Sequence, residues 1–435
     1  MNLVSADDTR EAVRPVYDPE AEEGMAHRSY LSPDRKWVLV AAMVRPAWQQ
    51  CRLVAIDGGV NRGVGPEGQC TTAAWSPDGK WMYLSSNSSG SFHIWRQRFP
   101  GGTPEQITFG PGEEEGVAMA PDGRSLLTSI GNRQSSIWVR DASGEREISV
   151  EGYAFFPSIP NAGTTQPFSA NGRLLYLVRK GPVQYAGPGE RVGEIWWSDL
   201  RMSQSEALLP GFRVSGYDLS RDGSRIAFAA MDDRGRSHIW LARIDRQTPP
   251  RQLATIEGDS PRFGAGGNVY FRGTDGGSSF IYRVSPSGEL TRAVDRPVAY
   301  LLSVSPDEAW VIARVQAVPG ADATQENLAF SMQGEQMIRL CGAACEVDWT
   351  SDGTSLVLRA GAGLWSERGR TFLIALRPGE MLPRIPPEGL RSEADLIGLR
   401  VSQVVEGAAF PQGVGRAVAF VRNTTQRNVF RVPLP

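Results

Sequence analysis

Histidine is scarce in this chain: among 435 residues there are three, His27, His93 and His238. A Ser-His-Asp triad needs a His beside its nucleophile, and zinc sites are usually built from His and Cys, so the scarcity argues against both. His93 and His238 stand at equivalent positions of a repeat described below, which favours a structural role for both.

Long apolar runs and one-sided charge are also missing. No segment approaches the ~18 consecutive apolar residues of a membrane span. Residues 1–24 hold no basic region followed by an apolar core, so the chain as given carries no secretory signal. A net charge of −2 provides no concentrated basic field for nucleic acid.

Catalytic motifs are absent from the sequence too. A protein kinase needs a Gly-rich loop, a strand Lys, a His-Arg-Asp loop and Asp-Phe-Gly. Propeller-bearing serine peptidases add a hydrolase domain with Gly-x-Ser-x-Gly, and neither set occurs here. The Gly-rich segment 110–116 carries three glutamates, which would repel phosphate. We therefore expect a protein that is not an enzyme.

What the sequence does contain is a repeat. Each copy has a small residue, then a turn former, then Asp or Gly, then usually Gly, and an apolar run follows. The pattern recurs eight times at intervals of 41 to 51 residues. The copies begin at Ser32, Ser76, Ala120, Ser169, Ser220, Gly264, Ser305 and Thr350. A period near 45 residues with strand-type sequence is typical of a β-propeller blade.

The second copy shows why the motif makes a hairpin. Residues 70–75 lead into the turn and residues 81–84 lead out. Pro77 presets φ, Asp78 can bond its own backbone and Gly79 accepts positive φ. We expect a three-residue hairpin loop with a bulge, followed by strands at residues 92–95 and 104–108.

An Ile followed by an aromatic residue in the third strand repeats with the same period. It occurs at His93-Ile94-Trp95, Ser136-Ile137-Trp138, Glu194-Ile195-Trp196, His238-Ile239-Trp240 and Phe280-Ile281-Tyr282. Two independent signals thus predict an all-β protein, a β-propeller of four-stranded antiparallel blades.

Blade number and closure follow less directly. A ninth strand pair, residues 417–420 with 428–432, lacks a fourth strand, and the extended segment 1–24 offers residues 12–17 as a closing strand. Eight blades in residues 25–435 is the central expectation. Nine blades in one ring, or one closed ring plus further blades of a second, are the alternatives.

These residues resemble known families. Ser76-Pro77-Asp78-Gly79-Lys80-Trp81, followed by an apolar strand, is similar to the TolB-type propeller repeat, a relative of the tryptophan-aspartate repeat, and the likeness covers nearly the whole chain from about residue 29. Residues 24–29, 92–100, 113–116 and 426–428 resemble the propeller that follows the kinase domain in bacterial eukaryotic-like serine/threonine kinases, notably of Acidobacteria. The second resemblance implies a sensor or interaction module beyond a membrane span, in a periplasmic or other extracytoplasmic location. Kinase and span are both missing here, so a fragment of a longer kinase or a stand-alone descendant is implied, and a cytoplasmic location stays open.

Four cysteines form two sequence pairs, Cys51 with Cys70 and Cys341 with Cys345. A metal site would want further ligands nearby, which disfavours zinc. A disulfide that clips a loop is favoured over zinc and would suit an oxidising compartment. Free, partly buried thiols are the plain alternative.

Candidate ligand residues lie in two classes of loop that gather at one end of a propeller channel. The loops that enter an inner strand contain Glu113, Glu114, Glu115, Glu151, Tyr153 and Asp259, together with Asp218 and Glu257; the loops between second and third strands contain Arg133 and Arg234, together with Gln134, Arg236 and Arg427. An acidic inner rim with basic residues farther out could bind a cationic peptide or a Ca²⁺ ion. The plain alternative is that loops are charged because they are solvated.

Two classes of function follow. The first is a noncatalytic binding or sensor propeller, expected to be a monomer without a resident cofactor, that recognises a protein, peptide or glycan. The second is a metal-dependent hydrolase or lyase that uses the channel, which the scarcity of His disfavours. Fold alone does not decide between them.

Overall fold

The fold is built almost entirely of strands. The computed structural model describes residues 3–6, 13–18, 24–44, 47–110, 112–149, 152–157, 167–169, 172–179, 192–200, 204–316, 325–342, 345–360 and 369–434. The helical elements in these residues are two short 3-10 turns, η2 (Ala265–Gly267) and η3 (Glu393–Leu396). No helix among these residues is long and apolar enough to cross a membrane. The all-β prediction is confirmed.

The chain divides into two compact units. We call the first the open array; it contains residues 1–134, 181–188 and 423–435. We call the second the ring; it contains residues 135–180 and 189–422. Strands β13 (Ser125–Asp141) and β36 (Val418–Pro433) contribute residues to both units.

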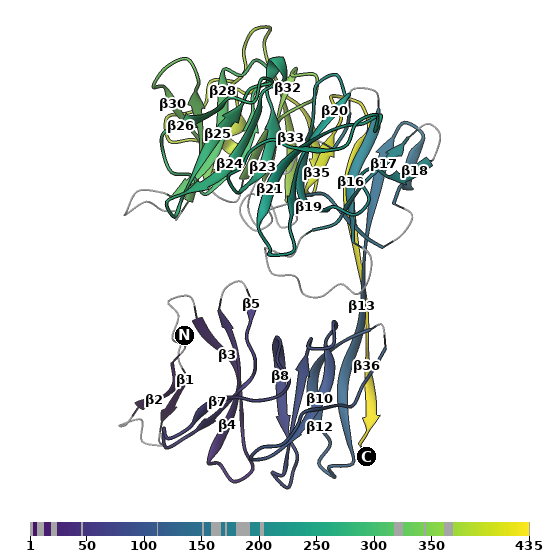
Figure 1. Ribbon diagram of the computed structural model, residues 1–435, viewed down its shortest axis with the longest axis vertical. Helices are drawn as coiled ribbons and strands as arrows, with labels where there is room; N and C mark the ends of the chain where they lie inside the picture. Colours follow the sequence, from purple (N-terminus) through teal and green to yellow (C-terminus); the bar gives the residue numbers. More distant parts are fainter. Residues whose placement is uncertain are drawn as a thin grey trace. The chain divides into compact units, whose positions relative to one another are not determined.

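Within its described residues the ring has six antiparallel sheets (Figure 1). Five are formed by strands consecutive in sequence: β15 (Tyr153–Phe155), β16 (Arg173–Arg179), β17 (Glu194–Asp199) and β18 (Gln204–Ala207); β19 (Arg213–Leu219), β20 (Arg225–Met231), β21 (Ser237–Arg243) and β22 (Arg251–Gln252); β23 (Gly258–Phe263), β24 (Val269–Asp275), β25 (Ser278–Val284) and β26 (Leu290–Val294); β27 (Tyr300–Val304), β28 (Trp310–Gln316), β29 (Gln325–Ser331) and β30 (Met337–Gly342); β31 (Cys345–Trp349), β32 (Ser355–Ala360), β33 (Arg370–Ala375) and β34 (Val401–Glu406). The sixth sheet combines β35 (Ala409–Pro411) and the start of β36 with the end of β13 and β14 (Gly144–Glu147).

Each sheet of the ring packs on the next through buried apolar side chains, and the last packs on the first. Ile137 of the sixth sheet shares a core with Tyr176 of β16. On the other side of the sixth sheet, the Thr371 hydroxyl of β33 accepts a hydrogen bond from the backbone N–H of Ala409 at 3.0 Å and donates one to the Gly407 carbonyl at 2.8 Å. The ring is therefore closed, and strands from distant parts of the sequence make its closing sheet.

The open array has three sheets in a row among its described residues. The first contains β3 (Gly24–Leu31), β4 (Trp37–Val44), β5 (Ala47–Trp48), β6 (Arg52–Ala55) and β7 (Asn61–Gly63); the second β8 (Cys70–Trp75), β9 (Trp81–Ser86), β10 (His93–Arg98) and β11 (Glu105–Gln106); the third β12 (Glu113–Met119), the start of β13 and the end of β36. A hairpin of β1 (Leu3–Ala6) and β2 (Val13–Tyr17) completes the unit. The third sheet of the open array and the sixth sheet of the ring are two parts of one sheet, so the described residues form eight sheets of four or five strands. Their arrangement is the expected alternative, one closed ring plus further blades, and not a single ring of eight.

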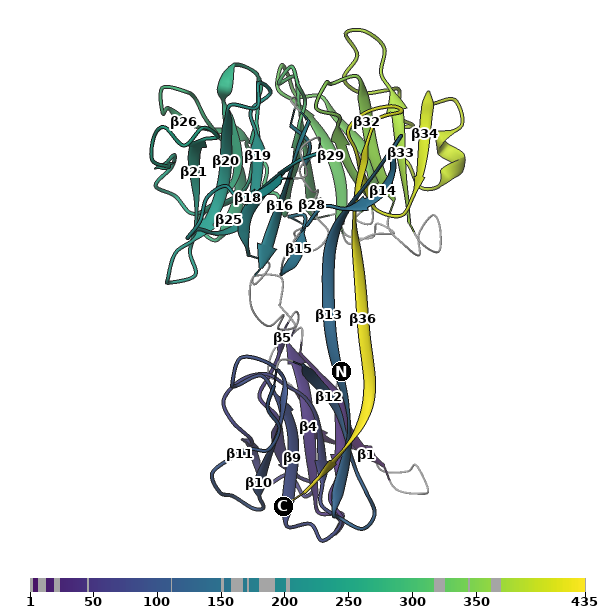
Figure 2. The same ribbon diagram turned by 90° about the vertical axis from the view of Figure 1, so that its right-hand side faces the viewer.

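Two predicted turns are wrong. We expected a loop at Arg133 and Gln134 and a hairpin between residues 420 and 428, but β13 and β36 continue through both segments side by side (Figure 2). Neither segment has the Pro-Asp-Gly turn signal, and the β-branched Thr424 and Thr425 favour an extended backbone. Among the described residues, β2 of the expected closing segment pairs with β1, and β36 of the last repeat pairs with β13.

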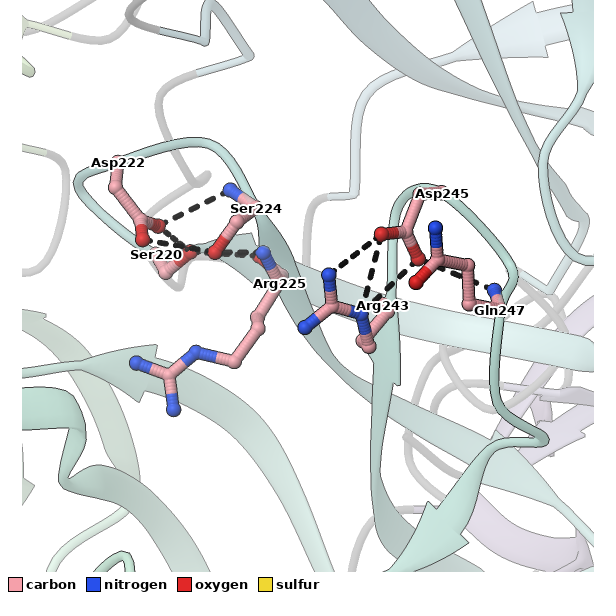
Figure 3. Close-up of polar contacts among 7 residues, drawn as sticks. All are labelled: Ser220, Asp222, Ser224, Arg225, Arg243, Asp245 and Gln247. Carbon is pink, nitrogen blue, oxygen red and sulfur yellow. Dashed lines mark hydrogen bonds and ion pairs between the residues drawn. The ribbon is translucent and has the colours of Figure 1, made fainter.

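The repeated turn itself forms as predicted. In the copy that Figure 3 shows, the Ser220 hydroxyl donates to Asp222 Oδ1 at 2.6 Å, and the Arg225 N–H donates to Ser220 Oγ at 2.9 Å. The Ser220 hydroxyl is the main reason why the pKa of Asp222 falls to about 2. Gly79 has φ of 70°, the positive value that the motif requires.

Both predicted cysteine pairs are disulfides. Cys51 and Cys70 join the start of β6 to the start of β8, and Cys341 and Cys345 join the end of β30 to the start of β31. Both bridges lie in buried cores, because all four cysteines are at most 3% exposed.

Candidate ligand site at one end of the ring

One position of the repeat has a distinctive composition in the ring. It lies on the inner strand, two residues before the first residue of the turn, and pairs with the second strand in the same register in each sheet. Its occupants in the six sheets are Pro167, Asp218, Arg262, Ser303, Asp348 and Phe410. Four consecutive sheets therefore place a polar or charged side chain at this position.

These four side chains line a common cavity. Its volume is about 120 Å³, and its wall contains Asp218, Arg262, Ser303 and Asp348. The aromatic residues Phe168, Phe263 and Trp349 line it as well. The cavity lies within the ring, at the end where the repeated turns join inner strands to second strands.

Asp218 is held by backbone donors. Its Oδ1 accepts the N–H of Leu219 at 2.9 Å, and its Oδ2 accepts the N–H of Phe263, in the neighbouring inner strand, at 2.7 Å. Desolvation by the surrounding protein outweighs these bonds and the nearby Arg262 charge, and it raises the pKa of Asp218 to about 7. The charge of Asp348 raises this pKa further.

Asp348 is the more deeply buried carboxylate, with 7% of its surface exposed. Its Oδ1 accepts the hydroxyl of Ser303 and the N–H of Trp349, the latter at 2.8 Å. The described residues give its other oxygen, Oδ2, no hydrogen-bond donor. Burial raises the pKa of Asp348, against the lowering effect of Arg359 and Arg262.

Arg262 supplies the buried positive charge of the cavity wall. Its Nε donates to the Leu302 carbonyl at 2.7 Å, and its Nη1 donates to the Pro261 carbonyl at 2.8 Å. These bonds fix the guanidinium in the wall, close enough to lower the pKa of both aspartates. Arg221, which also lines the cavity, is exposed.

The open array lacks this pattern. Its three equivalent positions hold Tyr30, Ala74 and Ala118. Tyr30 uses its hydroxyl to hydrogen bond Thr72 of the next inner strand at 2.8 Å. Because the turns repeat in both units while the charges occur only in the ring, the fold itself does not require them.

Part of the predicted site lies in the open array. Glu113, Glu114 and Glu115 begin β12. Glu114 is buried: its Oε2 accepts the Thr108 hydroxyl and the Ile94 N–H and lies 3.6 Å from His93 Nδ1. Glu113 and Glu115 form ion pairs with Arg427 at 4.0 and 3.1 Å.

The remaining predicted residues belong to other places. Tyr153 in β15 and Asp259 in β23 are half-buried in the ring, and Asp259 forms an ion pair with Arg272. Arg234 is exposed in the turn between β20 and β21. Arg133 lies in β13 rather than in a loop, and Glu151 lies outside the described residues. The structure thus distributes the predicted residues over both units, and their ligand role stays a prediction.

Sequence reasoning singled out one of the cavity charges, Asp218, and missed Arg262, Ser303 and Asp348. It examined the loops that enter the inner strands, whereas the cavity lies at the opposite end of those strands. A usable signal was present: aligning the repeats on their turns puts Asp, Arg, Ser and Asp in register in four consecutive copies. As for metals, the described residues contain no group of three or more His, Cys, Asp or Glu side chains placed to hold an ion.

Comparison with known proteins yields structural likenesses only. No protein-family model matches the chain, and no curated protein matches it. Among solved structures, TolB from Acinetobacter baumannii is 11% identical, with 82% of this chain and 83% of that chain covered and a TM-score of 0.36. The putative TolB from Agrobacterium tumefaciens is 17% identical, with 66% and 86% covered and a TM-score of 0.23. An oligogalacturonate lyase in complex with manganese is 12% identical, with 87% and 97% covered and a TM-score of 0.34. With every one of these TM-scores below 0.5, the propeller fold of this chain is established by its own sheet order and packing.

Proposed function

We propose that the protein is a noncatalytic binding propeller and that the cavity end of the ring recognises a protein, peptide or glycan. One observation carries the proposal: the repeat position that holds Tyr or Ala in the open array holds Asp218, Arg262, Ser303 and Asp348 in the ring. Buried charges destabilise a fold unless they are compensated, so a cluster that the fold does not need favours a functional role.

Cavity size favours an extended ligand. Sites that enclose a whole small molecule commonly measure about 300–1,000 Å³, whereas this cavity holds about 120 Å³. The cavity would therefore take one group of a longer ligand, while the rest of the ligand lies over the surrounding turns.

The resemblance to kinase-associated propellers suggests a sensor or interaction module, and the two disulfides favour an extracytoplasmic location.

The test is a ligand screen of the full chain against a displayed peptide library and a glycan array. Enriched ligands should bind Asp218→Asn or Asp348→Asn protein at least about tenfold more weakly, a change of about 1.4 kcal/mol. Asp275→Asn, on an exposed carboxylate of β24 that does not line the cavity, is the matched control and should leave binding unchanged. Mass spectrometry should recover each ligand chemically intact. Ligands whose affinity is unchanged by the cavity substitutions, or ligands that are cleaved, would overturn the proposal.

A further inference from the structure

Two carboxylates and one guanidinium line the inner part of the cavity wall: Asp348 and Arg262 are buried, and Asp218 is half-buried. Asp218 and Asp348 face one buried guanidinium, that of Arg262, because Arg221 is exposed to solvent. The buried Arg359 of β32 also lowers the pKa of Asp348, but the Arg359 guanidinium is itself paired with Glu346 at 3.1 Å. One carboxylate of the wall is therefore left without a full counter-charge.

The hydrogen-bonding groups of the wall point to the same deficit. Oδ2 of Asp348 has no donor among the described residues, and it is not sealed from the cavity, so a group in the cavity can reach it. The Ser303 hydroxyl is already committed to Oδ1 of Asp348. A ligand group that satisfies this wall has to bring donors.

Aromatic rings complete the wall. Phe168, Phe263 and Trp349 line the cavity beside the two aspartates, and the Trp349 indole N–H is engaged by the Met381 carbonyl at 2.8 Å. Aromatic faces attract cations that have been taken out of water, and sets of aromatic and acidic side chains recognise ammonium groups. An ammonium or guanidinium offers donors and no acceptor, so it would not place a lone pair against a carboxylate.

We infer that the group which enters this cavity is a single cationic nitrogen of the ligand, an alkylammonium or a guanidinium, held between Asp218 and Asp348. This inference rests on the proposed binding function and names the chemistry of its anchor. A cavity of about 120 Å³ accommodates the head of a Lys or Arg side chain or a free amino terminus.

Cation binding should also compete with a proton. The pKa of about 7 leaves Asp218 partly protonated at neutral pH, and the charged groups around it are Arg262 and Asp348. A cation favours the ionised carboxylate, so binding should strengthen as the pH rises from about 6 to about 8.

The experiment uses capped glycine pentapeptides whose central residue is lysine, arginine, norleucine or citrulline, titrated into the full chain by calorimetry. Lysine or arginine should bind at least about tenfold tighter than its neutral counterpart, norleucine or citrulline respectively. A free-amine glycine peptide separates an amino terminus from a side chain as the source of the nitrogen. Because this comparison uses the native protein, it does not depend on any variant folding.

Asp348→Asn should reduce the preference for the cationic peptides, and Asp275→Asn, an exposed site outside the cavity lining, should keep it. Equal affinity for cationic and neutral peptides, or no binding of either, would overturn the inference. If ligands from the library screen still depend on Asp218 and Asp348 in that case, the proposed function stands and only its anchor is wrong. Calcium or manganese that raises the melting midpoint and displaces the peptides would make this a metal site and would also overturn the inference.

Discussion

The backbone N–H of Phe263 donates a hydrogen bond of 2.7 Å to Oδ2 of Asp218, from one inner strand of the ring to the next. The bond fixes a carboxylate that burial would otherwise disfavour, since desolvation raises its pKa to about 7. Asp218 therefore couples the stability of the ring to pH.

The sign of this coupling gives the first prediction. A carboxylate whose folded pKa lies above its unfolded value destabilises the fold as the pH rises from about 4 to about 7, by on the order of 2–4 kcal/mol. Asp218→Asn removes this loss but also removes one acceptor, at about 1 kcal/mol. The melting midpoint of the variant should lie below that of the native protein near pH 4.5 and rise relative to it by pH 8. Parallel pH profiles would contradict the assigned pKa.

Aspartates of the repeated turns should act in the opposite direction. The pKa values of Asp34, Asp78, Asp222 and Asp352 are lowered, with that of Asp222 at about 2. Stability that is present above pH 4 should be lost as the pH falls from about 4 to about 2. Over this pH range, the melting midpoint of the Asp222→Asn variant should fall less than that of the native protein. Asp275→Asn, on an exposed carboxylate outside the turns, is the control and should follow the native profile.

Gly79 tests the turn geometry. Its φ is 70°, and the atoms that an added Cβ would meet, in Pro33, are 3.8 Å away or more, so crowding contributes little. Gly79→Ala should cost about 1–3 kcal/mol through backbone strain. Gly334→Ala is the matched control, since Gly334 has open space and no positive φ. Denaturant midpoints that shift equally in the two variants would count against this explanation.

Glu114 tests the buried cluster of the open array. Glu114→Ala leaves the buried Thr108 hydroxyl without its acceptor and removes one of the two acceptors of the Ile94 N–H, which should cost about 1–3 kcal/mol. Glu115→Gln breaks only a half-exposed ion pair with Arg427 and should cost less than about 1 kcal/mol. Urea denaturation compares the two, and equal losses would be the contrary result.

The predicted ligand role of Glu113, Glu114 and Glu115 can be examined by replacing all three with Gln. A calcium-dependent rise in midpoint that the triple Gln substitution abolishes would show that these glutamates hold a cation. An unchanged calcium response would place the cation elsewhere.

Closure can be tested by deletion. Removing residues 409–435 takes away β35 and β36 and should abolish cooperative unfolding, because the ring loses two strands of its closing sheet. Removing residues 1–18 takes away β1 and β2, which pair with each other, and should lower the midpoint only modestly. A larger loss from the second deletion than from the first would restore the amino-terminal segment as the closing element.

Turn chemistry made the blades predictable. Ser76, Asp78 and Gly79 each contribute a bond or a backbone angle that only a tight hairpin uses, so the repeat identifies its own strands. What the sequence could not show was which turns are missing. Gly131 and Gln134 resemble loop residues, yet they lie inside β13, because pairing with β36 supplies hydrogen bonds that local propensity does not report. The cavity was hidden for a related reason, since Asp218 and Asp348 become neighbours only when the ring closes.

The pairing of β13 with β36 has a consequence for biosynthesis. Glu145, just beyond β13, and Arg422 of β36 form an ion pair although they are 277 positions apart in the chain. On the ribosome, β13 emerges long before β36 has been synthesised. The edge of β13 that pairs with β36 therefore stays unpaired while the strands of five sheets are synthesised. An unpaired edge of this length is a site for wrong pairing with other nascent chains. Chaperones that cover extended strands during translation should therefore raise the soluble yield of this protein more than that of a propeller closed by a local hairpin.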